Sequence, residues 1–130
     1  RQFIETNLQA SRDVLVYTSR NLITQSSNLT PLQVGEVVST ALVEIVRGLS
    51  TVPAWIVAKG GITSSDIATK GLGIRRANVL GQVLPGVPVW KTGSESKWKN
   101  SIYVVFPGNV GGEDAISQVV KTLRKRDKPA

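Results

Sequence analysis

Two glycine-rich segments carry the residues best suited to chemistry in this sequence. The first is Lys59-Gly60-Gly61-Ile62-Thr63, and the second is Pro107-Gly108-Asn109-Val110-Gly111-Gly112. Each follows a short apolar run typical of a buried strand and precedes a stretch with helical spacing. A glycine turn lets the backbone approach a ligand closely, and the N–H groups that begin the next helix attract phosphate. Each segment therefore indicates a phosphate-binding loop at the carboxyl end of a strand.

On the residues alone, each segment also fits an ordinary strand-to-helix turn. Neither segment matches the P-loop or the dinucleotide-binding pattern, so a plain turn is the simpler interpretation of either one. Lys59 either pairs with a phosphate or ends a solvated strand. Thr63 either contacts a phosphate or metal or caps the next helix, and capping is the favoured role.

The chain has no histidine and no cysteine. Thiolate chemistry and disulfides are therefore excluded, and the commonest general base and metal ligand are missing. The absence of cysteine fits a cytoplasmic origin. Asp66, Glu95, Glu113 and Asp114 are the acids near the glycine segments, and they show no metal-ligand spacing. The residues thus leave any metal site unknown.

The hydrophobic pattern predicts the elements that position these segments. Residues 31–49 follow helical spacing without a miss, which predicts one broad buried stripe, and Thr30 with Gln33 has capping-box spacing. Further helices are expected over residues 1–12, 64–72 (with a second capping box, Thr63 and Asp66) and 113–126. Strands are expected at 14–17, 54–58, 79–84, 87–90 and 102–106. The strands at 79–84 and 87–90 flank a Pro85-Gly86 turn and would form an antiparallel edge of the sheet. Residues 90–98 are a polar connection or, as the alternative, a lid. The fold prediction is α/β: one domain over residues 1–130, with a mostly parallel or mixed sheet covered by helices on both faces.

Composition sets the class of protein and its charge. With 130 residues, 41% hydrophobic and 19% charged, the chain is typical of a globular domain, and no apolar run is long enough to span a membrane. The net charge is +7, and the last ten residues hold five basic side chains against one acid: Lys121, Arg124, Lys125, Arg126 and Lys128. A basic helix end complements the helix dipole, so we favour a solvated face over nucleic-acid binding.

Three ordered motifs, considered together, resemble a known family. They are residues 59–66 (KGGITSSD), 77–90 (ANVLGQVLPGVPVW) and 104–111 (VVFPGNVG). In sequence and spacing they are similar to the carboxyl-terminal nucleotide-binding domain of the four-carbon acid sugar kinases, above all the eukaryotic members fused to other enzyme domains. A weaker likeness begins at Val14, so that the resemblance covers nearly the whole chain.

The resemblance implies a function for the glycine segments. Members of the family transfer the γ-phosphate of ATP, with Mg²⁺, to a hydroxyl of a sugar acid such as a threonate or 3-oxo-tetronate. The implied nucleotide contacts are Gly60, Gly61, Ile62 and Thr63, together with Gly108. The bacterial pattern has an acid where this chain has Ile62, so that contact here would be through the backbone only. No catalytic residue is implied within this chain.

The resemblance also implies partners. The sugar acid would bind an N-terminal domain of the same protein, and one further nucleotide contact would lie upstream. We therefore expect a piece of a longer kinase that binds ATP or ADP without catalysis. A metabolite-sensing regulatory domain and a basic nucleic-acid-binding module are the alternatives. The particular sugar acid, the fused domains and homo-oligomer formation stay open.

Overall fold

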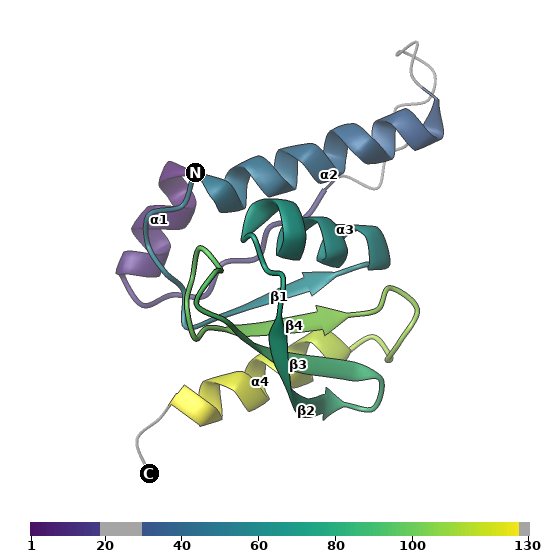
Figure 1. The fold of residues 1–130 in the computed structure, drawn as a ribbon. Coiled ribbons are helices and arrows are strands. Elements are labelled where there is room, and N and C mark those ends of the chain that lie inside the picture. Colours follow the sequence, from purple (N-terminus) through teal and green to yellow (C-terminus); the bar gives the residue numbers. More distant parts are fainter. Residues whose placement is uncertain (19–29, 128–130) are drawn as a thin grey trace. The chain divides into compact units, whose positions relative to one another are not determined.

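The computed structural model describes residues 1–18 and 30–127 (Figure 1). The chain divides into two compact units, Arg1–Val52 and Pro53–Ala130, and each is treated by itself below. Within the described ranges, no helix combines the length and apolar character needed to cross a bilayer.

The first unit consists of α1 (Gln2–Gln9) and α2 (Pro31–Arg47), which confirms both helices predicted there. The predicted capping box of α2 is present: the Thr30 hydroxyl accepts a hydrogen bond from the Gln33 amide at 3.2 Å, and the Gln33 side-chain oxygen accepts one from the Thr30 amide at 2.9 Å. The predicted stripe is buried only toward the end of the helix, at Val46 and Leu49, whereas Val37 is 57% exposed.

The predicted strand at residues 14–17 is wrong. The described residues around it have no regular secondary structure, and Leu15 and Tyr17 are 70% and 81% exposed. A strand must exchange backbone hydrogen bonds with a neighbouring strand, and the described part of this unit contains only helices. The apolar run alone carried no information about such a partner.

The second unit is built on a four-stranded sheet. Its strands are β1 (Trp55–Lys59), β2 (Ala77–Leu84), β3 (Val87–Thr92) and β4 (Ile102–Phe106), in the order β1-β4-β3-β2. β1 is parallel to β4, whereas β3 is antiparallel to both β4 and β2. The sheet is therefore mixed rather than mostly parallel, and the antiparallel β2–β3 hairpin around Pro85-Gly86 is confirmed.

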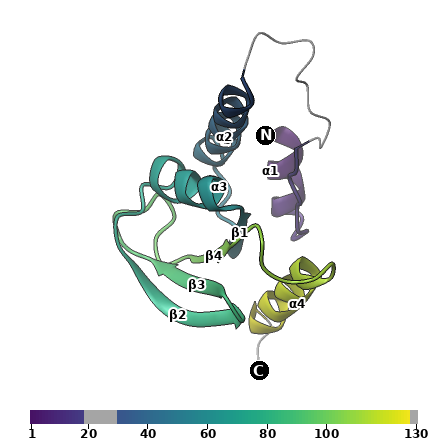
Figure 2. The ribbon, with the colours of Figure 1, turned by 90° about the vertical axis from the view of Figure 1, so that its right-hand side faces the viewer.

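Helices cover both faces of this sheet, as predicted for an α/β fold. Figure 2 shows α3 (Gly61–Asp66) and α4 (Ala115–Asp127) on opposite sides of the strands. Alternate residues of β4 point to the two sides. Phe106 belongs to the buried cluster that includes Val119 of α4, and Tyr103 donates a hydrogen bond from its hydroxyl to the Ser64 carbonyl of α3 at 2.6 Å. Burial raises the pKa of the Tyr103 hydroxyl, so it stays protonated and donates this bond.

Two helix starts differ from the predictions. α3 begins at Gly61, directly after its N-cap Gly60, and continues as the π-helical turn η1 (Ile67–Gly71). Thr63 therefore lies inside the first turn, and the capping box predicted for Thr63 and Asp66 is wrong. α4 begins at Ala115, two residues later than predicted, so that Glu113 and Asp114 precede the helix instead of forming its first turn.

The segment predicted as a polar loop at residues 90–98 is anchored. β3 extends through Thr92, whose hydroxyl donates to the Trp98 carbonyl at 2.6 Å and accepts from the Ser101 amide at 2.8 Å. Thr92, Ser96 and Trp98 are each buried. These contacts favour a fixed connection over a lid.

Candidate functional site

The parallel pairing of β1 with β4 brings the two glycine segments together. The last paired residues of these strands are Lys59 and Phe106, and the ladder continues one step further through a 2.8 Å hydrogen bond from the Gly60 amide to the Phe106 carbonyl. A Cβ built on Gly108 would lie 3.7 Å from the Gly60 Cα. The residues predicted to contact nucleotide from both loops thus lie side by side at one edge of the sheet.

Gly60 forms the turn between β1 and α3. Its φ of +108° is a backbone conformation that residues other than glycine rarely adopt. Its amide already donates a hydrogen bond to the Phe106 carbonyl, and its carbonyl accepts one from the Ser64 amide at 2.9 Å. Gly60 therefore shapes the loop without offering its own N–H to a ligand. The first N–H groups of a helix lack a carbonyl within that helix, which leaves the amides of Gly61, Ile62 and Thr63 to bind an anion.

Gly61 and Gly108 differ from the glycines that the fold itself requires. A Cβ on Gly61 would meet no atom within 4 Å, and one on Gly108 would meet only the Gly60 Cα at an ordinary contact distance. Neither has a positive φ. Gly111, by contrast, has a φ of +83°, and a Cβ there would lie 2.5 Å from the Ala115 Cβ. Internal packing therefore explains Gly111, whereas at Gly61 and Gly108 the open space suits the close approach of a ligand.

Lys59 places a positive charge beside both loops. The side chain is exposed, and its Nζ donates to the Gly108 carbonyl at 3.4 Å and lies 5.4 Å from the centre of the Phe106 ring. The second of these contacts is a cation–π interaction. Lys59 thus links the two loops, and its ammonium group is close enough to their edge to attract an anion.

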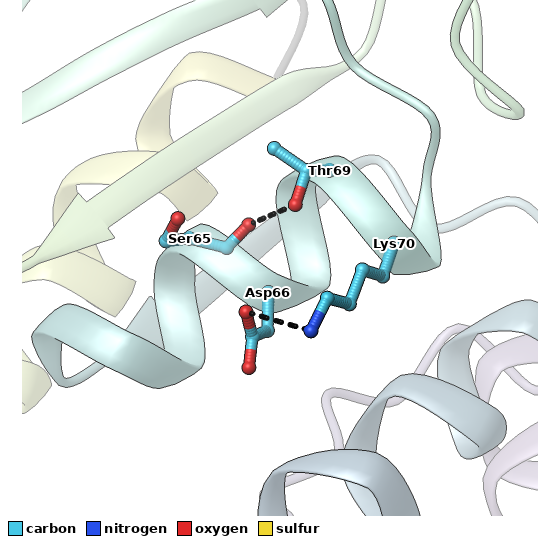
Figure 3. Close-up of polar contacts among 4 residues, drawn as sticks. All are labelled: Ser65, Asp66, Thr69 and Lys70. Atoms are coloured by element: carbon cyan, nitrogen blue, oxygen red, sulfur yellow. Dashed lines mark hydrogen bonds and ion pairs between the residues drawn. The ribbon is translucent and has the colours of Figure 1, made fainter.

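The acidic side chains described near the loops do not gather into a metal site. Among the described residues, no group of three or more acidic side chains is placed to hold a metal ion. Asp66 forms an ion pair with Lys70 at 3.6 Å, one helical turn further on (Figure 3). Ile62 is 71% exposed and has no polar atom in its side chain, so only its backbone can hydrogen-bond to a ligand.

A groove that no sequence pattern indicated lies beside the loops. It has a volume of about 520 Å³. Each glycine loop contributes one residue to its lining, Gly61 from the first and Pro107 from the second. One wall is the α3–η1 helix, and the floor is the side of the sheet that faces this helix. The wall residues are Ser64, Ser65, Ala68 and Thr69, the floor residues are Ala77, Val79, Trp90 and Val105, and Ile74 and Arg75 complete the lining.

The helix wall presents few free polar groups to this groove. Thr69 donates its hydroxyl to the Ser65 carbonyl at 2.9 Å, as Figure 3 shows, and the Ser64 hydroxyl donates to the Gly61 carbonyl at 3.2 Å. Both hydroxyls are turned back onto the helix backbone. The groove is therefore mainly apolar along its length.

Glu95 fixes the segment that carries Arg75. Its carboxylate accepts hydrogen bonds from the backbone amides of Arg76 at 2.9 Å and Arg75 at 3.1 Å. The bond from the Arg76 amide is the largest of the causes that lower the pKa of Glu95. This exposed acid therefore organises the backbone beside the groove.

The chain is similar to known proteins both in sequence and in fold. Residues 1–116 match the family model described as the nucleotide-binding C-terminal domain. The fold is similar to that of a Haemophilus influenzae protein of family DUF1537 (TM-score 0.60, 21% identity, 70% of this chain and 21% of that one). It is also similar to a DUF1537 domain from Bordetella bronchiseptica, a domain-swapped dimer with bound citrate (TM-score 0.57, 19% identity, 92% of this chain and 29% of that one).

A search of curated proteins gave no significant match. The chain spans only 21% and 29% of the length of the two similar structures. The match over residues 1–116 nevertheless covers most of the chain. The chain therefore belongs to the nucleotide-binding C-terminal domain family, which confirms the resemblance to the carboxyl-terminal domain of the four-carbon acid sugar kinases.

Proposed function

We propose that this domain binds ATP and ADP and is the nucleotide-binding part of a kinase for four-carbon sugar acids of the threonate or 3-oxo-tetronate type. The observation that carries the proposal is that the two glycine loops lie side by side at the ends of β1 and β4. A 2.8 Å hydrogen bond from the Gly60 amide to the Phe106 carbonyl joins the chain segments there. Membership of a nucleotide-binding family supports the choice of ligand.

The loops suit the phosphates of a nucleotide. The amides of Gly61, Ile62 and Thr63 begin a helix, where partial positive charge favours an anion. Gly61 and Gly108 leave room for phosphate oxygens to approach the backbone, and the Lys59 ammonium lies at the same edge. Mg²⁺ would arrive with the nucleotide and neutralise part of the phosphate charge.

Phosphoryl transfer also needs an acceptor held in line with the γ-phosphate. In this proposal the sugar acid binds a separate N-terminal domain of the same protein, and that domain supplies the catalytic acid. The 130-residue chain spans less than a third of each similar structure, which supports such a division.

We expect the 130-residue chain to bind ADP and ATP weakly and to phosphorylate no four-carbon sugar acid. Titration calorimetry at millimolar nucleotide measures the first property, and release of ADP in the presence of threonate measures the second. A folded chain that takes up no nucleotide would contradict the binding site. Turnover of a sugar acid by this chain would show that the acceptor site lies within it, and the proposed division would be wrong.

The basic residues of α4 are expected to contribute little to nucleotide binding. Of the five basic residues in the last ten, Arg126 has no described side chain and Lys128 lies outside the described residues. Lys121, the nearest of the five, lies six residues after Ala115, which places it about 9 Å along the helix from its start, and Arg124 lies about 14 Å from it. At physiological salt the Debye length is about 8 Å, so exposed charges at these distances are largely screened.

Replacing all five with glutamine should therefore change the ADP dissociation constant less than about twofold. The same variant should lose most of any salt-sensitive binding to DNA or RNA, because such binding depends on neutralising phosphates. A tenfold loss of ADP affinity would instead mean that the basic segment reaches the nucleotide.

A further inference from the structure

The groove beside the glycine loops is continuous with the proposed phosphate site. Gly61 belongs both to the first loop and to the groove lining, and Pro107, which opens the second loop, lies at the same end. A ligand whose phosphates contact the loops would therefore have the rest of its structure directed toward this groove. The volume of about 520 Å³ is within the range of roughly 300–1,000 Å³ typical of small-molecule sites.

An aromatic side chain forms the centre of the groove floor. Trp90 is half-buried in β3, and its ring stacks on that of Tyr103 with centroids 5.9 Å apart and planes 27° apart. Tyr103 is fully buried and is held in turn by its 2.6 Å hydrogen bond to the Ser64 carbonyl. The indole is thus supported from behind, and a flat ligand could stack on it without first ordering the side chain.

The remaining lining also favours a flat and weakly polar group. Val79, the partner of Trp90 on β2, contributes to the floor and is 68% exposed. The Thr69 hydroxyl on the opposite wall is already bonded to the Ser65 carbonyl. Arg75, at the far end, brings a planar guanidinium that can stack on an aromatic ring or donate hydrogen bonds to it.

We propose that this groove is the base subsite of the nucleotide, with a purine ring stacked on Trp90 between the sheet and the α3–η1 helix. The inference rests on the proposed function, because it takes the phosphates to lie at the glycine loops. A ligand that joins phosphates to a flat aromatic ring fits both parts of the site, and a nucleoside di- or triphosphate is such a ligand. The apolar floor then provides affinity, and the loops fix the orientation.

The test compares ADP with inorganic pyrophosphate, which has the phosphates without the base. In the 130-residue chain, Trp90→Leu should weaken ADP binding about tenfold or more, since base–aromatic stacking is worth that much, and should leave pyrophosphate binding unchanged. Trp90→Phe retains an aromatic floor and should keep most of the ADP affinity. In the parent chain ADP should quench tryptophan fluorescence, and Trp90→Phe should remove that quenching.

A second variant tests the groove independently of whether Trp90→Leu folds. Thr69→Leu changes an exposed helix residue and narrows the groove from the opposite wall. It should therefore weaken the binding of ADP but not the binding of pyrophosphate. If ADP binds both variants as tightly as the parent chain, the base does not occupy the groove, and the inference is overturned while the phosphate site stands. If the folded parent binds neither ligand, the proposed function fails together with the inference.

Discussion

Gly61→Val is expected to abolish nucleotide binding without unfolding the protein. Gly61 has an ordinary φ, and a Cβ there would meet no protein atom within 4 Å, so the fold tolerates a side chain. The same Cβ would project where a phosphate must approach the amides that begin α3. We expect ADP affinity to fall at least about 100-fold, or ~2.7 kcal/mol, when measured by calorimetry.

Two further variants complete this experiment. Gly108→Val adds a side chain to the second loop, where a Cβ would meet only the Gly60 Cα of the first loop, at 3.7 Å, and it should have a similar effect. Gly35→Val, in the middle of α2, also replaces a glycine that has open space around it, and it should leave nucleotide binding intact. If folded Gly61→Val bound ADP like the parent chain, the phosphates could not lie at these amides.

Gly111→Val is expected to destabilise the fold strongly. A φ of +83° is unfavourable for a β-branched residue, and a Cβ at this position would lie 2.5 Å from the Ala115 Cβ at the start of α4. Backbone strain and overpacking each cost about 1–3 kcal/mol, so we expect the free energy of unfolding to fall by about 2–6 kcal/mol. Urea denaturation followed by circular dichroism measures this change.

The neighbouring glycine provides the control for that measurement. Gly112 has no positive φ, and a Cβ there would meet only a side-chain oxygen of Asp114, at 3.7 Å. Gly112→Ala should therefore change the unfolding free energy by no more than about 0.5 kcal/mol. Equal destabilisation by both variants would mean that the loop tolerates no side chain at all, and the specific contact between Gly111 and Ala115 would not be the cause.

Local patterns in the sequence predicted most of the elements of this fold. The helix α2 was predictable because its apolar spacing and the capping box of Thr30 and Gln33 are both local signals. The strands β1 and β4 and the hairpin at Pro85-Gly86 were predictable for the same reason. Each of these features depends on residues within a few positions of one another.

The errors came from features that depend on distant residues or on unusual backbone geometry. Residues 14–17 have the composition of a strand, but pairing requires a partner that composition cannot supply. The start of α3 was placed three residues late because Thr63 and Asp66 have capping-box spacing. The positive φ of Gly60 instead turns the chain directly from β1 into the helix, with no side-chain cap.

One part of the candidate site was predictable from local patterns, and the other part was not. The two glycine loops could be recognised because each is a contiguous motif at the end of a strand. The groove could not, because Thr69, Val79 and Trp90 are ordinary helix and strand residues in the sequence. They face one another only once the order β1-β4-β3-β2 is known and α3 is placed on one side of the sheet.

The central claim is that nucleotide phosphates bind the backbone amides at the union of the two glycine loops. Backbone amide chemical shifts of the ¹⁵N-labelled chain, recorded during titration with ADP, test it most directly. We predict that the largest shifts occur at Gly61, Ile62 and Thr63 and in the loop that begins at Gly108, with little change in the second half of α4. Shifts confined to α4, or shifts that avoid both loops while ADP binds, would contradict it.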